Sequence, residues 1–300
     1  MSLSTFVISI TPFDDRGRLD EFAFRAHLDR MADAGIGVYL GGGGSGEGFT
    51  LSPEEARRVL EIGVEHIAGR VPVRAMGVEP RTAADMIAYL RVAADAGVDA
   101  AQVYSLDPGH GHRPSPAEVE NYLDQVLSST ELPCVVSSHL SVGYRLSPSM
   151  LRRMAQTYPQ LIGVNCSHPD LGPLLALRDS VGDLLELHVG GPAQALSAIA
   201  LGANGFLSSE GNLAPKTCVG LLEAASNEDF ATCATAFAAI ARLSTLLYRV
   251  GGIRATKGVM RALGLPAGFV REPQLDADEA TVASVLAFLE TSPIPQIEGW

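Results

Sequence analysis

The chain has 300 residues, of which 47% are hydrophobic and 19% charged, so it can build a folded core and is neither disordered nor fibrous. Its net charge of −12 argues against nucleic acid or an anionic membrane surface as a partner, because both attract positively charged faces. The length fits one large domain or two ordinary ones.

Cysteine usage and the absence of a targeting signal indicate a reduced compartment. The four cysteines lie far apart and form no C-x-x-C pair: Cys134, Cys166, Cys218 and Cys233. The first residues carry no basic segment typical of a secretory signal, and the apolar stretch 235–248 is interrupted by Arg242. We therefore expect a cytoplasmic protein with no membrane partner.

Short, almost wholly apolar runs recur along the first 210 residues, as in strands buried on both faces of a parallel sheet. They cover residues 5–11, 37–42, 72–77, 100–104, 134–138, 161–165, 184–189 and 205–208.

Helical patterns separate these runs. Ser52 and Ser115 each begin a capping box with proline at the first helical position, and Thr82 begins a weaker one. Gly35, Gly97 and Gly202 stand where a helix would end before the next strand. Eight such units predict a (β/α)8 barrel over residues 1–225. The alternative, a doubly wound sheet, would normally place G-x-G-x-x-G after its first strand, and that motif is missing.

After about residue 225 only helical patterns remain, over residues 227–250, 253–263 and 278–289. No linker or low-complexity stretch precedes them. We therefore expect residues 226–300 to form a C-terminal helical extension packed on the barrel.

A glycine-rich segment, residues 41–48, follows the second predicted strand. Such a run allows successive backbone N–H groups to point at one anion, and Ser45 adds a hydroxyl. The alternative is a turn needed only for chain closure. Because barrel active sites lie at the carboxyl ends of strands, the position favours a carboxylate or phosphate site.

The segment Gly43-Gly-Ser-Gly-Glu47-Gly-Phe-x-Leu-Ser52-x-Glu-Glu55 resembles the signature of the dihydrodipicolinate synthase / N-acetylneuraminate lyase family. Further similarities follow in order: Thr11-Pro-Phe13, Gly202-Ala-Asn-Gly205, and Lys257-Gly with the later Gly264-Leu-Pro. The resemblance implies a (β/α)8 barrel with C-terminal helices, and chemistry on C–C bonds beside a 2-keto acid, usually pyruvate. It also implies a homotetramer or dimer. We expect no cofactor, with a divalent metal as the alternative considered below.

The sequence departs from this family where its chemistry is performed. The family's Schiff-base lysine aligns with Asn165, and an amide nitrogen is not a nucleophilic amine. The family's first relay tyrosine aligns with Ser137, and the second falls in the segment 110–115. The first of two paired hydroxyls has become Gly44, and no arginine stands near residues 141–142. The substrate contacts implied by the resemblance are Gly44, Ser45, Glu47, Gly191, Leu207 and Ser208.

Several histidines follow the fourth to seventh predicted strands. They are His110, His112, His139, His168 and His188, with Glu47 and Glu210 on the same rim. Imidazole beside carboxylate suits acid–base chemistry or a divalent metal, although each histidine alone is more typical of an ordinary polar residue. Our catalytic candidates are Asn165, Ser137, His139 and His110, and our candidate metal ligands are His110, His112, His139 and His188.

Three functions are compatible with these residues. The first is a lyase- or hydratase-type enzyme acting on a small carboxylate or 2-keto acid without a Schiff base. The second is an inactive paralogue that only binds such a ligand. The third is an ordinary family lyase in which Lys216 or Lys257, the only two lysines, replaces the missing one. The polar rim favours the first.

Overall fold

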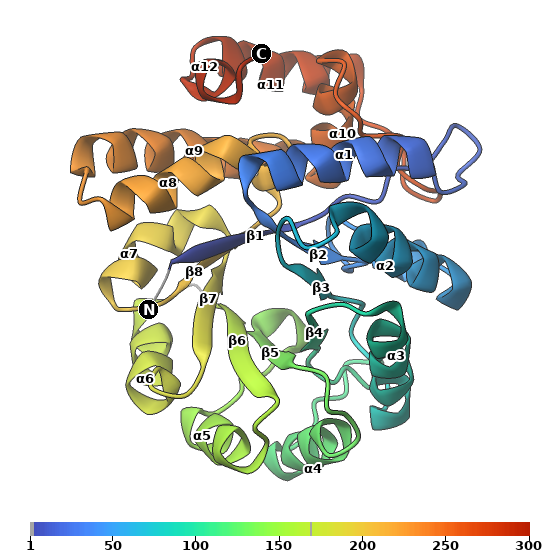
Figure 1. Cartoon of the computed structure of the whole chain (residues 1–300), viewed down its shortest axis with the longest axis vertical. Coiled ribbons are helices and arrows are strands. Elements are labelled where there is room, and N and C mark those ends of the chain that lie inside the picture. The colour runs from blue at the N-terminus through green and yellow to red at the C-terminus, as the bar shows by residue number, and fades with distance from the viewer. Residues whose placement is uncertain (1–2, 169) are drawn as a thin grey trace.

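The computed structural model describes residues 3–168 and 170–300; residues 1 and 2 of the predicted barrel range lie outside them. Eight parallel strands close into a barrel in chain order, with β8 paired to β1 (Figure 1). The strands are β1 Ser4–Ile8, β2 Gly37–Leu40, β3 Val73–Ala75, β4 Ala100–Val103, β5 Cys134–His139, β6 Leu161–Ser167, β7 Glu186–Gly190 and β8 Gly205–Ser208. Each overlaps one predicted run, so the predicted (β/α)8 barrel is confirmed.

Helices alternate with the strands and cover the outside of the barrel (Figure 1). They are α1 Glu21–Ala34, α2 Pro53–Ile67, α3 Ala83–Ala96, α4 Pro116–Leu127, α5 Pro148–Thr157, α6 Leu171–Val181, α7 Ala195–Ala200 and α8 Pro215–Ser226. Short 3₁₀ turns span Gly48–Thr50, Leu140–Val142, Pro192–Gln194 and Glu210–Asn212.

The predicted start and stop signals act as expected. Ser52, Thr82 and Ser115 each accept a hydrogen bond from the third helical N–H, and the carboxylate of that third residue accepts one from the backbone N–H of the cap residue. Gly35 and Gly97 follow α1 and α3 with φ of 74° and 79°, a left-handed conformation that glycine adopts without steric cost.

Four more helices form the C-terminal extension, which lies beside α1 and α8 on one side of the barrel (Figure 1). They are α9 Phe230–Val250, α10 Ile253–Ala262, α11 Glu279–Glu290 and α12 Ile294–Glu298. The sequence predicts the first three, and α12 is an addition. The division of the chain after residue 225 falls one residue before the end of α8, and it stays a prediction.

A residue of α12 caps the N-terminus of α8. No side chain of its own caps the N-terminus of α8. Instead the buried Glu298 carboxylate accepts hydrogen bonds from the Thr217 N–H at 2.8 Å and the Thr217 hydroxyl at 2.7 Å. A carboxylate at a helix N-terminus is stabilising, because it satisfies free N–H groups and opposes the helix dipole.

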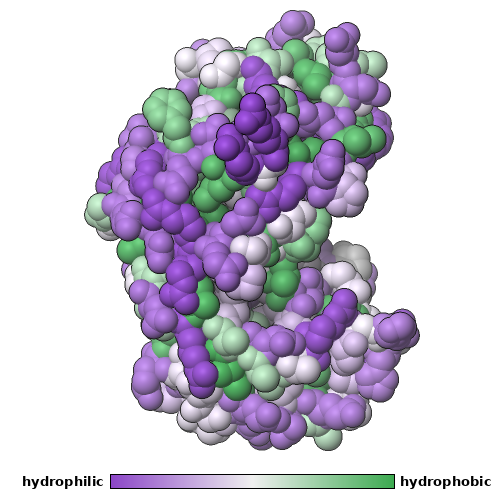
Figure 2. All heavy atoms as spheres, turned by 90° about the vertical axis from the view of Figure 1, so that its right-hand side faces the viewer, coloured by the Kyte–Doolittle hydropathy of each residue, from purple (hydrophilic) through white to green (hydrophobic). Residues whose placement is uncertain are grey.

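Helix α9 is long and apolar enough to cross a membrane by length and composition alone. In the described part of the chain it packs against α8, α10 and α11, as a core helix of a globular protein does. On the face drawn in Figure 2, hydrophilic residues predominate and apolar ones are scattered, and the outline is hollowed on one side.

The barrel interior is more polar than the branched aliphatic filling typical of this fold. Tyr39, Arg74, Gln102, Asn165 and His188 are all buried. The Arg74 guanidinium lies 4.2 Å from the centre of the Phe6 ring and reaches Glu186 Oε2 at 3.1 Å. The interior below the barrel mouth therefore holds a buried guanidinium that is paired with a carboxylate.

Candidate active site

A cavity of about 390 Å³ opens where the strands end, and residues that follow or end all eight strands line it. Its lining includes Gly44, Glu79, Gln102, Tyr104, Ser137, His139, Ser141, Asn165, Ser167, Gly191, Leu207 and Ser209. Among the described residues, no lysine or arginine lines it, and Glu79 and His139 are its acid–base groups other than tyrosines. The site is thus polar but lacks a fixed cation.

The glycine-rich segment reaches this cavity through Gly44, as the sequence predicts. The backbone N–H groups of Gly44 and Ser45 make no hydrogen bond to any described residue. Two successive free N–H groups are suited to one carboxylate or phosphate oxygen. Gly48 has a different role: a Cβ there would lie 2.1 Å from the Gly41 carbonyl oxygen, so close packing of the loop requires glycine.

A smaller chamber of about 240 Å³ adjoins the main cavity and shares Gly44, Ser209 and Tyr248 with it. Ser45 and Glu210 line this chamber and not the main cavity. The predicted substrate contact Ser45 therefore lies next to the main cavity but lines the smaller chamber instead.

Asn165 stands near the end of β6 and lines the main cavity, but its amide hydrogens are already used. Nδ2 donates to Tyr39 Oη at 3.1 Å and to Gln102 Oε1 at 2.6 Å. Oδ1, an acceptor, is left without a partner in the described part of the chain. In this arrangement both N–H groups of Asn165 are bound within the protein, so its amide offers a ligand only an acceptor, and its catalytic role stays a prediction.

Ser137 lies beside Asn165 in the strand register and keeps a usable hydroxyl hydrogen. Ser137 Oγ accepts from the Ser105 N–H at 2.8 Å, and the Ser105 hydroxyl donates to the Ser137 carbonyl at 3.0 Å. Ser137 Oγ also lies 3.2 Å from Ser105 Oγ, so the Ser137 O–H has two alternatives: it can donate to Ser105 Oγ or turn to a ligand in the cavity.

His139 ends β5 and is the one candidate histidine that lines the main cavity. Its Nδ1 is hydrogen-bonded to the Ser141 hydroxyl, and its Nε2 lies 3.7 Å from Glu79 Oε1. Burial lowers the pKa of His139, and the Glu79 carboxylate opposes that shift. The imidazole is therefore neutral at neutral pH and can accept a proton.

The remaining histidines do not gather around one ligand. His110 and His112 lie on an exposed loop, His188 is inside the barrel with Nε2 2.8 Å from Ser4 Oγ, and His168 is buried behind the strands near Ser138. Within residues 3–168 and 170–300 no three His, Cys, Asp or Glu side chains form a metal-binding group. Among the described residues, the structure therefore places His110 outside the cavity and does not bring the four candidate metal ligands together around one ion.

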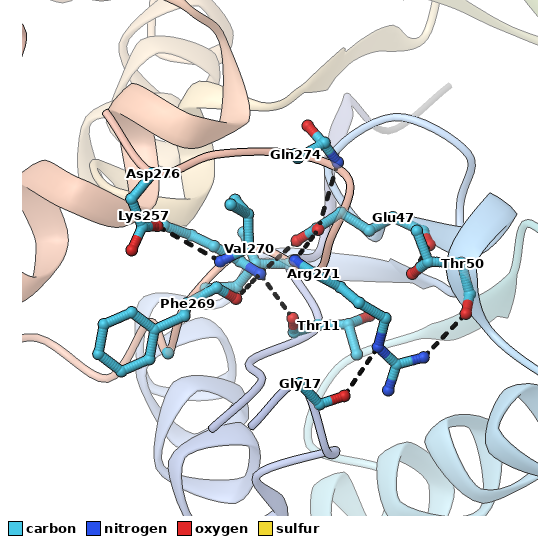
Figure 3. Close-up of polar contacts among 12 residues, drawn as sticks. Thr11, Gly17, Glu47, Thr50, Lys257, Phe269, Val270, Arg271, Gln274 and Asp276 are labelled. Carbon is cyan, nitrogen blue, oxygen red and sulfur yellow. Dashed lines mark hydrogen bonds and ion pairs between the residues drawn. The ribbon is translucent and has the colours of Figure 1, made fainter. Parts of the chain in front are cut away.

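Glu47 was a predicted substrate contact, and the structure assigns its carboxylate to another partner. The carboxylate is fully buried and forms an ion pair with Lys257 of α10 (Figure 3). Its Oε2 also accepts from the Arg271 N–H at 2.9 Å. Lys257 Nζ also donates hydrogen bonds to the carbonyl oxygens of Thr11 and Phe269, each at 2.8 Å. Glu47 therefore anchors the glycine loop to the extension.

Ser208 is likewise turned away from the cavity. On β8 the side chains alternate, so Leu207 and Ser209 line the cavity while Ser208 faces α8. Ser208 Oγ donates to Glu210 Oε2 at 3.0 Å and accepts from the Gly211 N–H at 2.9 Å. The predicted contacts Gly44, Gly191 and Leu207 do line the cavity.

Four polar side chains that the sequence did not single out as candidates also line the cavity: Glu79, Gln102, Tyr104 and Ser141. Each follows or ends a strand, so the position rule for barrels was the available signal. Neither lysine is near: Lys216 Nζ donates to the Glu298 carbonyl at 2.8 Å, and Lys257 is fully buried against Glu47.

Comparison with known proteins agrees with this architecture. The family model described as "Dihydrodipicolinate synthetase family" matches residues 2–292. A 4-hydroxy-tetrahydrodipicolinate synthase of Phenylobacterium zucineum is 31% identical over 279 residues, 93% of each chain.

Solved structures share the fold. The 4-hydroxy-tetrahydrodipicolinate synthase of Methylacidiphilum fumariolicum superposes with a TM-score of 0.90 at 20% identity, covering 100% of this chain and 99% of that one. YagE, a prophage protein of E. coli K12 solved in complex with pyruvate, gives 0.89 at 24% identity, covering 97% and 99%.

Proposed function

Because the chain belongs to the dihydrodipicolinate synthetase family, we propose that it is a lyase-type enzyme that binds a small carboxylate or 2-keto acid without forming a Schiff base. The observation that carries the proposal is the cavity lining: Asn165 stands near the end of β6, and neither lysine reaches the cavity. Imine formation needs an unprotonated primary amine beside the ketone, and an amide cannot replace it.

The free N–H groups of Gly44 and Ser45 are the proposed site for the ligand carboxylate. A carbonyl next to that carboxylate would accept a hydrogen bond from the Ser137 hydroxyl, which polarises it as negative charge develops on oxygen. The neutral imidazole of His139 then acts as the general base. That a family member was solved with pyruvate supports a 2-keto acid as the first ligand to test.

A thermal-shift titration with pyruvate and lactate, followed by borohydride treatment and intact-protein mass spectrometry, tests the proposal. We expect a ligand-dependent rise in Tm, since a ligand that binds only the folded state stabilises it, and no covalent adduct. An adduct on Lys216 or Lys257 would restore the ordinary family reaction, and the absence of any shift up to millimolar ligand would refute the carboxylate site.

Turnover separates the enzyme from a protein that only binds. Incubation with a 4-hydroxy-2-keto acid should release pyruvate, and that release should depend on His139. Binding without release would favour the inactive paralogue. A cytoplasmic homo-oligomer, a dimer or a tetramer, remains our expectation for the assembly.

A further inference from the structure

Three side chains of the cavity form a connected array around His139. Ser141 follows β5 by two residues, and Glu79 lies in the loop after β3; both line the cavity. The Ser141 hydroxyl is hydrogen-bonded to His139 Nδ1, and Glu79 Oε1 lies on the opposite side of the ring, 3.7 Å from Nε2. The Tyr104 ring packs edge-on against the imidazole, with centroids 6.0 Å apart. The imidazole is thus held between a hydroxyl and a carboxylate.

The charges around the ring determine which nitrogen carries its hydrogen. Nε2 is buried and makes no hydrogen bond to a described residue, and it faces the Glu79 carboxylate. A nitrogen lone pair facing an anion would be repelled, so the N–H of the neutral ring belongs on Nε2. Nδ1 is then the acceptor, and the hydroxyl of Ser141 donates to it.

We propose that Ser141 is a catalytic hydroxyl activated by His139, with Glu79 as the residue that positions the imidazole and stabilises its protonated form. This inference deepens the proposed function, on whose cavity it rests, by naming the groups that move the proton. The arrangement follows the logic of a nucleophile, a base and an orienting carboxylate, here with the two ring nitrogens exchanged relative to a serine protease triad.

The proton transfer balances without an added reactant. As a substrate hydroxyl gives its proton to Ser141 Oγ, the Ser141 proton moves to His139 Nδ1. One O–H bond breaks on the substrate and one N–H bond forms on the ring. The imidazolium then carries both N–H groups, with Nε2–H directed at Glu79, and the reverse sequence returns the proton to a product.

Diisopropyl fluorophosphate tests the activation of Ser141 without any knowledge of the substrate. The Ser141 oxygen would form a bond to phosphorus as the P–F bond breaks, with fluoride leaving and the serine proton passing to His139. We expect one adduct, mapped to Ser141 by peptide mass spectrometry. Labelling should be lost in Ser141→Ala and fall at least tenfold in His139→Gln. His112→Gln, which changes an exposed histidine outside the cavity, should label at the native rate.

Nitrogen-15 NMR of the histidine rings tests the role of Glu79 separately. We expect the Nε2–H tautomer for His139 in the native protein, and a lower His139 pKa in Glu79→Gln, because removal of the anion disfavours the imidazolium. A merely structural role of Glu79 would change Tm and leave that pKa unmoved. Each variant is first checked for a cooperative unfolding transition, and Glu79→Ser serves if Glu79→Gln does not fold.

The outcomes separate this inference from the proposed function. No adduct, an adduct elsewhere, labelling that is unaffected by His139→Gln, or an Nδ1–H tautomer would overturn the activated serine. Labelling of Ser141 in a protein that binds no carboxylate would support the serine and refute the carboxylate site instead.

Discussion

Lys257 of α10 and Glu47 of the glycine loop form a fully buried ion pair, although 210 residues separate them in sequence. Lys257 Nζ also donates to the carbonyls of Thr11 and Phe269, and Glu47 Oε2 accepts from the N–H of Arg271. The pair joins the extension to the loop that we assign to carboxylate binding (Figure 3).

Lys257→Met should destabilise the protein by about 3–5 kcal/mol, because it leaves the Glu47 carboxylate buried without a cation. Chemical denaturation of the variant measures the loss. Lys257→Met combined with Glu47→Gln should lose less than the sum of the two single changes, since both charges are then removed. Additive losses would show that the two residues act independently.

Gly44→Ala should fold normally yet bind a carboxylate at least ~10-fold more weakly, which is about 1.4 kcal/mol. A Cβ at Gly44 meets no atom within 4 Å, so the methyl group projects into free space at the cavity. Gly48→Ala is the matched control: its Cβ collides with the Gly41 carbonyl, and we expect a loss of about 2 kcal/mol in stability. Tm and pyruvate titrations of both variants check the contrast, which unaltered binding by Gly44→Ala would contradict.

Asn165→Lys should create a pyruvate adduct that borohydride traps at residue 165, whereas the native protein gives none. The new amine would lie in a buried site near the Arg74 guanidinium, and both features favour its unprotonated, nucleophilic form. Peptide mapping by mass spectrometry locates the adduct. If the variant folds, binds pyruvate and still gives no adduct, the position of residue 165 does not match that of the family lysine.

Acid should destabilise the protein through two buried histidines. Burial lowers the pKa of His27 and of His188 to about 3, whereas the unfolded chain protonates both near 6.5. The unfolded state therefore binds more protons between those values, and stability falls as pH decreases from 6.5 towards 3. Between pH 6.5 and 4.5 each histidine should contribute a loss of about 2–3 kcal/mol.

Denaturation of native protein and His188→Gln at both pH values isolates one of these contributions. The variant should lose about 2–3 kcal/mol less than the native protein on acidification. Equal losses in the two proteins would mean that His188 becomes protonated without unfolding.

The barrel could be predicted from the sequence because its signals are local. Ser52, Ser115 and Thr82 mark helix starts by their own neighbours, and each apolar run is long enough to be a buried strand. Helix α12 was missed since it is only five residues long and is held by Glu298 contacts to α8, which no local pattern reveals.

The site was predicted less well, for two physical reasons. Successive side chains of a strand point to opposite faces, and the sequence does not show which alternate residues face the barrel interior. Ser208 was therefore expected in the cavity, whereas its neighbours Leu207 and Ser209 line it. The partner of a polar residue can also lie far away in sequence, as with Glu47 and Lys257. No local pattern marks Ser141 either, because the Glu79 carboxylate on the other side of the same imidazole comes from the distant loop after β3.

The cap that Glu298 provides for α8 imposes an order on biosynthesis. The N–H of Thr217 leaves the ribosome 81 residues before the carboxylate that accepts its hydrogen bond. Until residue 298 emerges, the eighth helix of the barrel has an unsatisfied N-terminus, and α12 cannot yet dock on it. Closure of the barrel by its final helix is therefore expected to be complete only after translation of the C-terminal extension, and a stop codon before residue 298 should yield a chain that proteases cleave near α8.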